Sequence, residues 1–478
     1  MAFEPPFPAE VALVLAEIVV LLRVLTRPHR EPASRLAWLA VVIAIPLLGI
    51  LAYLILGETR ISGRRRERGR DVDAHLPRPG GDPACLAQLG DGPYQAPFAL
   101  ARTINQLDPS CSNSARLAAD TDAAIDEMVA DIDAARNHVH VCTYIWLADG
   151  NGLKFKDACI RAADRGVEVR LLADALGSRR FIASHHWKEL RERGCKVRVA
   201  LPVGNPLWTL IRGRVDLRNH RKMMIVDNRV TWIGSQNIAD REFRIKARYA
   251  PWVDIMSRWE GPVARQVQYL FVSDWVAEGG DDISKYLSSV DFGGTESILA
   301  QVIGTGPTSS FDAMPSCFSE LIHSARHELL ITTPYFVPDE QLLFAITSAG
   351  RRGVRSIMIF PKRCDSRIVA ATSRSYYEDL VKAGVEIFEY SVGMLHSKTI
   401  VVDGKIGLIG SANLDRRSFE LNFENNILFA DQGFASAVRD RQNQYLAAST
   451  RITADDIAGV SLARRIWCNL LATMSPVL

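Results

Sequence analysis

Apolar residues gather near the amino-terminal end of the chain. The 21 residues from Leu36 to Leu56 contain no charged side chain. A helix rises about 1.5 Å per residue, so a run of this length spans a hydrocarbon core of roughly 30 Å. A membrane environment also tolerates the kink that Pro46 or Gly49 would introduce. The pattern therefore predicts a transmembrane helix over residues 36–56.

A second apolar segment, residues 11–25, is shorter and is interrupted by Glu17 and Arg23. It fits a short first span, an interfacial helix or part of a signal peptide. A signal peptide carries basic residues ahead of its apolar run, whereas residues 1–10 carry only acids, so a signal peptide is disfavoured. Of the other two, a first span that forms a helical hairpin with residues 36–56 is favoured over an interfacial helix. Residues 57–70 are rich in arginine, and positive flanks stay in the cytoplasm. We therefore expect a multi-pass protein of the cell membrane whose remaining chain lies on the cytoplasmic side.

Farther along the chain, patterns of buried strands alternate with helical patterns, and the same order occurs twice. Each first strand follows a helical stretch, and a glycine separates later helices from the strands that come after them. The alternation predicts an α/β fold in which helices flank a mostly buried sheet in each of two similar halves. The matching segments are residues 138–146 and 328–336, 165–174 and 352–361, and 192–200 and 382–390.

These patterns divide the chain into four parts. Residues 71–84 hold three prolines and two glycines, which is typical of a linker. Residues 278–297 are polar and rich in glycine, and they separate the two repeated patterns. We expect a membrane anchor in residues 1–60, a basic flank and linker in 61–100, a first half in 101–280 and a second half in 295–478.

Composition narrows the class of protein. Charged residues make up 23% of the chain and hydrophobic residues 48%, which excludes wholesale disorder, a collagen-like repeat and a coiled-coil rod. The net charge of +3 is too small for a protein that coats nucleic acid, so no nucleic-acid partner is expected. The eight cysteines are scattered without a CxxC pair, so we expect free thiols in a reducing compartment and no zinc site.

The most specific signal is a motif that occurs once in each half. Residues 220–237 read HRKMMIVDNRVTWIGSQN and residues 396–413 read HSKTIVVDGKIGLIGSAN, and both fit HxKxxxxDxxxxxxGSxN without a gap. The HxKxxxxD part alone has a chance frequency of about one in 8,000 positions. Two copies with GSxN at the same offset therefore indicate a duplication. Polar residues that merely hold the fold are the alternative, but such residues on apolar strands are costly unless they are paired or used.

The duplicated residues suit the chemistry of a phosphate ester. If the halves share one site, one histidine of His220 and His396 can attack phosphorus and the other can protonate the leaving alkoxide. Lys222 and Lys398 supply positive charge, so neither a metal nor an organic cofactor is expected. Hydrogen-bond donors to the charge of the transition state are provided by Ser235, Asn237, Ser411 and Asn413.

Each histidine also needs an acceptor for its second ring nitrogen. Asp254 lies downstream of the first motif and Glu424 downstream of the second, and both are candidates for this role. Asp227 and Asp403, the acidic residues of the motifs, are further catalytic candidates. They close strands next to a turn, so a hydrogen bond to the turn explains them at least as well.

The duplicated HKD motif resembles that of the phospholipase D superfamily. With the amino-terminal anchor and the segments RNHRKMMIVD (218–227), TTPYFVPD (332–339) and GSANLDRRSFELNFE (410–424), the chain resembles the bacterial cardiolipin synthases. The resemblance implies two pseudo-symmetric α/β/α halves with mixed sheets packed about one active site, preceded by transmembrane helices. It also implies that Glu424 orients a histidine. The same spacing in the first half falls on Arg248, so Asp254 takes that place.

The resemblance implies an activity as well. Enzymes of this family in the bacterial inner membrane transfer a phosphatidyl group between two phosphatidylglycerol molecules, forming cardiolipin and releasing glycerol. The reaction is ping-pong through phosphatidyl-histidine, and His220 is the favoured nucleophile, with His396 as the alternative. A phospholipase D-type hydrolase or a transferase similar to phosphatidylserine synthase is the alternative within the superfamily. No oligomeric state is predicted.

Overall fold

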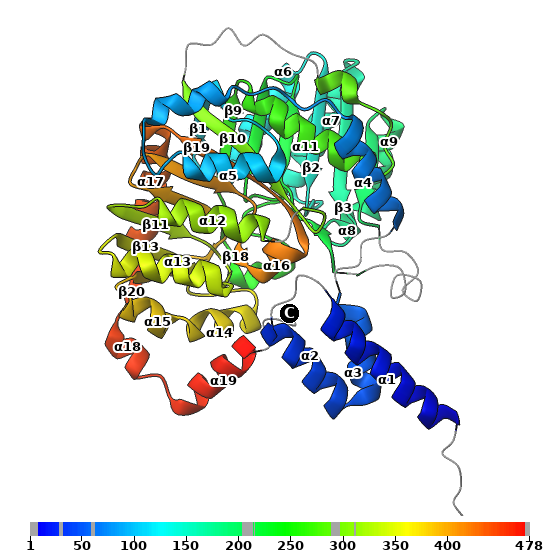
Figure 1. Ribbon diagram of the computed structural model, residues 1–478. Helices are drawn as coiled ribbons and strands as arrows, with labels where there is room; N and C mark the ends of the chain where they lie inside the picture. Colours follow the sequence, from blue (N-terminus) through cyan, green and yellow to red (C-terminus); the bar gives the residue numbers. More distant parts are fainter. Residues whose placement is uncertain are drawn as a thin grey trace, which may run out of the picture.

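A single long β-sheet organises the molecule (Figure 1). The computed structural model describes residues 8–27, 32–58, 63–202, 214, 216–287, 297–309 and 312–473. Within these ranges the sheet has 16 strands and contains both parallel and antiparallel pairs. The expected α/β fold with mixed sheets in two halves is confirmed, and the two sheets prove to be continuous with each other.

The strand order shows the duplication. From the centre outwards the first half runs β1, β9, β7, β6, β2, β3, β4, and the second runs β10, β19, β17, β16, β11, β13, β14, with β20 added at its edge. The halves join where β1 pairs antiparallel with β10. The strands of the first half are β1 (Ser110–Leu117), β2 (His138–Thr143), β3 (Glu168–Asp174), β4 (Lys196–Ala200), β6 (Met223–Val226), β7 (Val230–Gly234) and β9 (Met256–Glu260). Those of the second are β10 (Ile298–Thr305), β11 (Glu328–Thr332), β13 (Arg355–Pro361), β14 (Glu386–Tyr390), β16 (Thr399–Val402), β17 (Ile406–Gly410), β19 (Asn422–Ala430) and β20 (Ser449–Ile452).

Helices cover both faces of the sheet, so its inner strands are buried on both sides. Every residue of β2 and of β16 is buried, as expected for strands with no solvent-facing side. In the first half, α6 and α7 pack on one face and α11 on the other. The corresponding helices of the second half are α12 and α13 on one face and α17 on the other. Their bounds are α6 (Thr121–Ala134), α7 (Gly150–Asp164), α11 (Val263–Ala277), α12 (Ala313–His323), α13 (Glu340–Arg351) and α17 (Gln432–Ala447).

Aspartates and glycines set the ends of these helices. The carboxylates of Asp120 and Asp149 accept backbone N–H groups at the start of α6 and α7, and Asp431 does the same for α17. Gly166 and Gly353 follow α7 and α13 with φ of 87° and 82°, a conformation that other residues adopt only with strain. The shorter helices are α8 (Arg179–Ile182), α9 (His185–Glu192), η2 (Arg244–Tyr249), η3 (Ser284–Leu287), α14 (Arg367–Ser375), α15 (Tyr377–Lys382), α16 (Arg416–Glu420), α18 (Ala454–Ala458) and α19 (Leu462–Thr473).

The segment expected to be a basic flank and linker is folded onto the domain. It forms α4 (Gly63–His75), η1 (Pro83–Leu89) and α5 (Ala96–Asn105). Arg65 is buried, forms an ion pair with Glu278 and stacks over the Phe423 ring at 4.5 Å. At least this arginine therefore holds the flank to the protein instead of lying in solvent.

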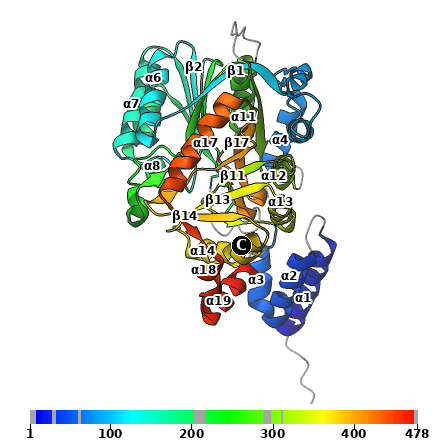
Figure 2. The ribbon, with the colours of Figure 1, turned by 90° about the vertical axis from the view of Figure 1, so that its left-hand side faces the viewer.

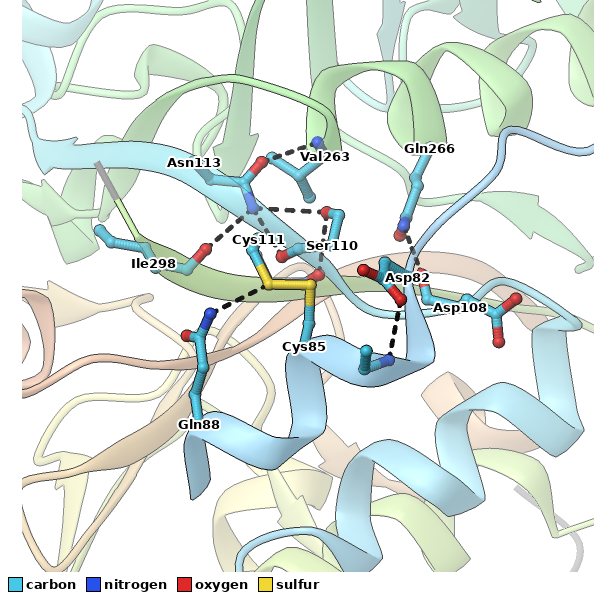
Figure 3. Close-up of a disulfide and its surroundings, with 12 residues drawn as sticks. Asp82, Cys85, Gln88, Asp108, Ser110, Cys111, Asn113, Val263, Gln266 and Ile298 are labelled. Atoms are coloured by element: carbon cyan, nitrogen blue, oxygen red, sulfur yellow. Dashed lines mark hydrogen bonds between the residues drawn. A yellow bond between two sulfur atoms is a disulfide. The ribbon is translucent and has the colours of Figure 1, made fainter. Parts of the chain in front are cut away.

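The expectation that all cysteines are free thiols is wrong for two of them. Cys85 on η1 and Cys111 on β1 form a disulfide, with their Cα atoms 5.8 Å apart (Figure 3). The two residues are separated by 26 positions in the chain. Their pairing depends on how η1 packs against β1, which the spacing of cysteines does not reveal. The other six cysteines are free.

The amino-terminal segment forms three helices, α1 (Pro8–Thr26), α2 (Pro32–Ala44) and α3 (Pro46–Leu56), which pack together beside the domain (Figure 1, Figure 2). The single helix expected over residues 36–56 is thus divided in two. Pro46 starts α3 because proline lacks the N–H that a continuous helix needs. Within the described residues, no single helix combines the length and the apolar character needed to cross a membrane.

Candidate active site

The two motif histidines lie where each half reaches across to the other. His220 follows β5 (Arg218–Asn219), which pairs with the start of β19 in the second half, and its backbone N–H donates to Phe423 O at 2.9 Å. His396 follows β15 (Met394–Leu395), which pairs with β8 (Trp252–Val253) of the first half, and donates to Val253 O at 2.8 Å. Both histidines line one cavity of about 510 Å³.

The carboxylates that hold the histidines are exchanged between the halves. Nδ1 of His220 lies 3.0 and 2.9 Å from the two carboxylate oxygens of Glu424. Nδ1 of His396 lies 2.6 Å from Oδ1 of Asp254. The sequence singles out both carboxylates, but each was expected to serve the motif that precedes it. The strand pairs β5–β19 and β8–β15 bring each carboxylate to the histidine of the opposite half instead.

The motif serines support these carboxylates. Ser235 Oγ donates to Asp254 Oδ1 at 2.6 Å, and Ser411 Oγ donates to Glu424. Neither serine is among the described residues that line the cavity. The sequence predicts contact with a phosphate for both. Their hydroxyls are instead committed to the carboxylates, so they fix the direction in which each histidine points.

Charge favours the ionised form of both carboxylates. Burial raises the pKa of Asp254, but His396, Lys398 and the Ser235 hydroxyl lower it further, so the net shift is downward. The pKa of Glu424 is lowered in the same way by His220 and Lys222 against the effect of burial. An ionised carboxylate accepts a hydrogen bond from Nδ1–H, and this leaves Nε2 of each ring free to react.

Burial favours the neutral form of both imidazoles. Burial lowers the pKa of His220 to about 4 and that of His396 to about 4, although the carboxylate beside each ring raises it. A neutral imidazole is the form that can attack phosphorus. The negative charge of a bound phosphodiester would raise both pKa values, which makes a protonated partner accessible once a substrate enters.

The motif lysines are buried directly behind the histidines. Lys222 Nζ donates to His220 O at 2.7 Å, and Lys398 Nζ donates to His396 O at 2.5 Å. Burial lowers the pKa of Lys222 to about 8 and that of Lys398 to about 7. Each lysine also lowers the pKa of the histidine in the other half, so the four groups form one electrostatic unit.

The motif asparagines lie at the cavity wall, whereas the motif aspartates do not. Asn237 and Asn413 both line the cavity. Asp227 accepts backbone N–H groups from residues 136, 137 and 138, each at 2.8 Å. Asp403 accepts the equivalent groups from residues 326, 327 and 328 at 2.7 to 2.8 Å. The expected catalytic role of the two aspartates therefore has no support, because they sit at the far ends of β6 and β16 and tie turns to neighbouring strands.

A match to the model of a protein family shows to which family the chain belongs. The model described as "Cardiolipin synthase, PLD-like domain" matches residues 128–275 and 318–446, which is more than half of the chain. The chain belongs to the cardiolipin synthase family. A second model, "Phospholipase_D-nuclease N-terminal", matches residues 17–58 of this family member, the region of α1 to α3.

Relatives extend the match over almost the whole chain. Cardiolipin synthase A of Erwinia tasmaniensis is 36% identical over 467 residues, and that of Serratia proteamaculans is 35% identical over 475. In both cases the match covers 96% of this chain and 96% of the relative. The solved phosphatidylserine synthase of Haemophilus influenzae Rd KW20 has a TM-score of 0.58 at 14% identity and covers 80% of this chain and 100% of its own, which shows a shared fold. The chain is thus an enzyme of the cardiolipin synthase family within the phospholipase D superfamily.

Further residues of this cardiolipin synthase site were missed from the sequence. The Tyr144 ring meets His220 edge-on at a centroid distance of 4.8 Å, and the Trp252 ring lies 4.8 Å from His396. Tyr144 directly follows the buried strand β2, and this position is the only sequence signal that could have pointed to it. Trp252 lies in the two-residue strand β8, which has no recognisable pattern. The cavity is also lined by cations that the motifs do not include, namely Arg179, Arg180, Arg218, Lys246 and Arg417.

Proposed function

We propose that the chain is a membrane-bound phosphatidyltransferase that makes cardiolipin and glycerol from two phosphatidylglycerol molecules. The observation that carries this proposal is the pair of histidines in one cavity, each hydrogen-bonded to a buried carboxylate. Two imidazoles on either side of one phosphorus allow one to attack while the other handles the proton of the leaving group.

In the first step, Nε2 of neutral His220 attacks the phosphorus of a bound phosphatidylglycerol. A P–N bond forms as the bond between phosphorus and the oxygen of the glycerol headgroup breaks. His396, in its protonated form, gives its Nε2 proton to that oxygen as the glycerol departs. The amides of the two motif asparagines, which line the cavity, donate to the phosphoryl oxygens. Lys222 and Lys398 are not among the described residues that line the cavity, and they offset the charge from their buried positions behind the histidines. The product is phosphatidyl-histidine at His220 and free glycerol.

In the second step, the headgroup hydroxyl of another phosphatidylglycerol attacks the same phosphorus. His396 removes the proton of that hydroxyl, the P–N bond breaks, and cardiolipin leaves with His220 neutral again. Water competes for the intermediate, so the acceptor must enter a cleft from which water is largely excluded. The apolar lining by Ile145, Leu147 and Phe243 supports such exclusion.

The amino-terminal helices would keep the cavity at the membrane surface. Side chains such as Val19 on α1 and Leu47 on α3 are 64% and 69% exposed, which suits lipid as their surroundings. The short helices α8 and α16, which carry cavity arginines, lie at the end of the domain that faces α1 to α3 (Figure 1). Holding both substrates and the enzyme in one surface raises their effective concentration.

We propose a cytoplasmic orientation for the domain from its arginine-rich flank. The Cys85–Cys111 disulfide is the observation against it, because disulfides persist mainly in oxidising compartments. A tag placed after Leu478 tests the orientation in intact cells or spheroplasts. If a probe that stays outside the membrane reaches the tag, the cytoplasmic orientation is wrong.

The activity is tested with the purified full chain in mixed micelles that contain phosphatidylglycerol and no added metal. We expect cardiolipin and glycerol in equal amounts, and the same rate after addition of EDTA. Phosphatidic acid as the main product would replace the proposal by a hydrolase. Complete loss of the rate in EDTA would overturn the metal-free mechanism.

A further inference from the structure

A second cavity, separate from the one that holds the histidines, is strongly basic. It has a volume of about 470 Å³ and lies between η2, the loop before α14, α14 itself and α19. None of the described residues that line it is acidic. Its cationic lining residues are Arg248, Lys362, Arg363, Arg367, Arg374 and Arg464, and the cavity is called the arginine pocket below.

Most of this positive charge is not neutralised by the protein. Arg374 forms an ion pair with Glu389 at 3.1 Å. Among the described residues, no carboxylate lies within ion-pair distance of Lys362, Arg363 or Arg367, and the same holds for Arg464. Cations gathered without counter-charges repel one another, so a concave cluster of this kind favours a bound anion.

An apolar helix face adjoins the pocket. Cys468 and Leu471 turn α19 towards the domain and are buried. On its other side α19 exposes Leu462, Ile466 and Trp467 by 72%, 59% and 56%, and Leu470 continues the same face. Trp467 also lines the arginine pocket, so the cationic and apolar surfaces meet at this residue. Tryptophan favours the boundary between lipid headgroups and acyl chains.

The arginine pocket lies on the membrane side of the domain and next to the catalytic cavity. Figure 1 and Figure 2 both show α19 at the end of the molecule where α1 to α3 lie. The two cavities share a wall, because η2 contributes Lys246 to one and Arg248 to the other. In that wall Lys246 pairs with Asp365, whose other oxygen accepts the Tyr335 hydroxyl at 2.6 Å.

We propose that the arginine pocket binds the headgroup phosphate of a second phosphatidylglycerol, whose acyl chains lie along the exposed face of α19. A phosphodiester brings the negative charge that the unpaired cations require, and the apolar face explains why the anion is a lipid and not a free phosphate. The identity of the lipid rests on the proposed function. Binding itself does not, because it needs no turnover.

The test measures lipid binding at Trp467 in the full chain with His220→Asn, so that lipid is not consumed. Protein in detergent micelles is titrated with phosphatidylglycerol that carries brominated acyl chains, which quench nearby tryptophan fluorescence. The chain has nine tryptophans, and Trp467→Phe identifies the part of the quenching that comes from α19. We expect this part to saturate at a lower lipid fraction than with brominated phosphatidylcholine.

The double variant Arg363→Gln/Arg367→Gln should weaken binding by about fivefold for each cation, or about 25-fold in all. The matched control is Arg136→Gln/Arg191→Gln, which removes two exposed arginines of the first half that line neither cavity, and it should bind as the parent does. Equal quenching by phosphatidylcholine, or unchanged binding in the pocket variant, would overturn the proposal. So would full displacement of the lipid by inorganic phosphate, which would show a site for free phosphate.

A second measurement separates this inference from the proposed function. With His220 intact, Arg363→Gln/Arg367→Gln should raise KM for phosphatidylglycerol and leave kcat within about twofold, because neither arginine lines the catalytic cavity. A fall in kcat with unchanged KM would contradict the assignment. If no variant makes cardiolipin, the proposed function fails while the quenching result still decides the lipid site.

Discussion

The two halves of the molecule present chemically similar histidines in different surroundings. Around His220 the cavity is lined by Tyr144 and by basic residues such as Arg218. Around His396 it is lined by Trp252 and Tyr335. Yet burial lowers the pKa of both imidazoles to about 4, so their intrinsic basicity does not distinguish them.

The nearby carboxylates differ more than the histidines do. Asp365 pairs with Lys246, and although burial opposes it, its pKa is lowered, so it remains ionised on the side of His396. Asp415 forms no such ion pair among the described residues, and burial raises its pKa to about 6, so it loses its negative charge at a higher pH than Asp365 does. The charge of Asp365 interacts with His396, and it favours imidazolium there. We expect from this difference that the duplicated motif supplies two equivalent groups and that the surroundings that are not duplicated assign their roles.

The roles of the two histidines are tested most directly by removing each histidine in turn. His220→Asn and His396→Asn should each lower the rate of cardiolipin formation by about 10^5-fold or more, because residues that act as a unit lose nearly all of the effect together. A donor whose leaving group is a nitrophenolate needs no proton. We expect it to restore a burst of nitrophenolate in His396→Asn and not in His220→Asn.

The burst is measured by stopped-flow absorbance, and the modified residue is located by mass spectrometry of peptides kept at alkaline pH. The wild-type chain with the same donor is the control. A burst in His220→Asn with label on residue 396 would reverse the roles and show that the surroundings were misjudged.

The second way to test the comparison is through the exchanged carboxylates. Glu424→Gln should behave as a defect of His220, and Asp254→Asn as a defect of His396, each with a loss of up to about 10^4-fold in kcat. The nitrophenolate donor decides the pairing. It should restore the burst in Asp254→Asn, as in His396→Asn, and not in Glu424→Gln, because only the loss of Glu424 leaves the nucleophile His220 without its partner. A burst in Glu424→Gln that is absent in Asp254→Asn would show that the crossed arrangement is wrong.

Lysine titration gives a smaller difference between the halves. The pKa of Lys398 is about 7 and that of Lys222 about 8, and each lysine is charged below its pKa. Affinity for tungstate, which stays a dianion in this range, should therefore fall by up to about tenfold per pH unit as pH rises through these values. The affinity is measured by isothermal titration calorimetry at a series of pH values. In Lys398→Gln the fall in affinity near pH 7 should disappear, and the fall near pH 8 should remain. An affinity that is constant up to pH 9 would contradict the lowered pKa values.

Much of this architecture could be predicted because the signals are local. Alternating patterns predict the strands, and the repeated motif singles out the histidines, lysines and asparagines that lie together. Pro46 carries a local signal for the break between α2 and α3, because proline lacks the N–H that a continuous helix needs, although a kink within one helix was expected there. Each of these features depends on neighbours within a few residues.

The exchange of the two carboxylates between the halves could not be predicted, because it depends on contacts between distant segments. Each exchange rests on a two-residue strand, β5 or β15, that pairs with the opposite half. Such short strands carry no periodic pattern. The Cys85–Cys111 disulfide and the commitment of Ser235 and Ser411 to carboxylates depend in the same way on which surfaces meet.

The smallest effect on activity is expected at the motif aspartates, and it also differs between the halves. Asp227→Asn and Asp403→Asn should leave kcat within about threefold, because neither carboxylate reaches the cavity, but each should lower stability by about 2 kcal/mol through weaker bonds to three backbone N–H groups. Asp403 also accepts a hydrogen bond from the Tyr94 hydroxyl at 2.8 Å, so Asp403→Asn should lower the stability more than Asp227→Asn does. Thermal unfolding with Tyr94→Phe as the control measures that excess. A loss of kcat by orders of magnitude at unchanged stability would return these aspartates to the catalytic site.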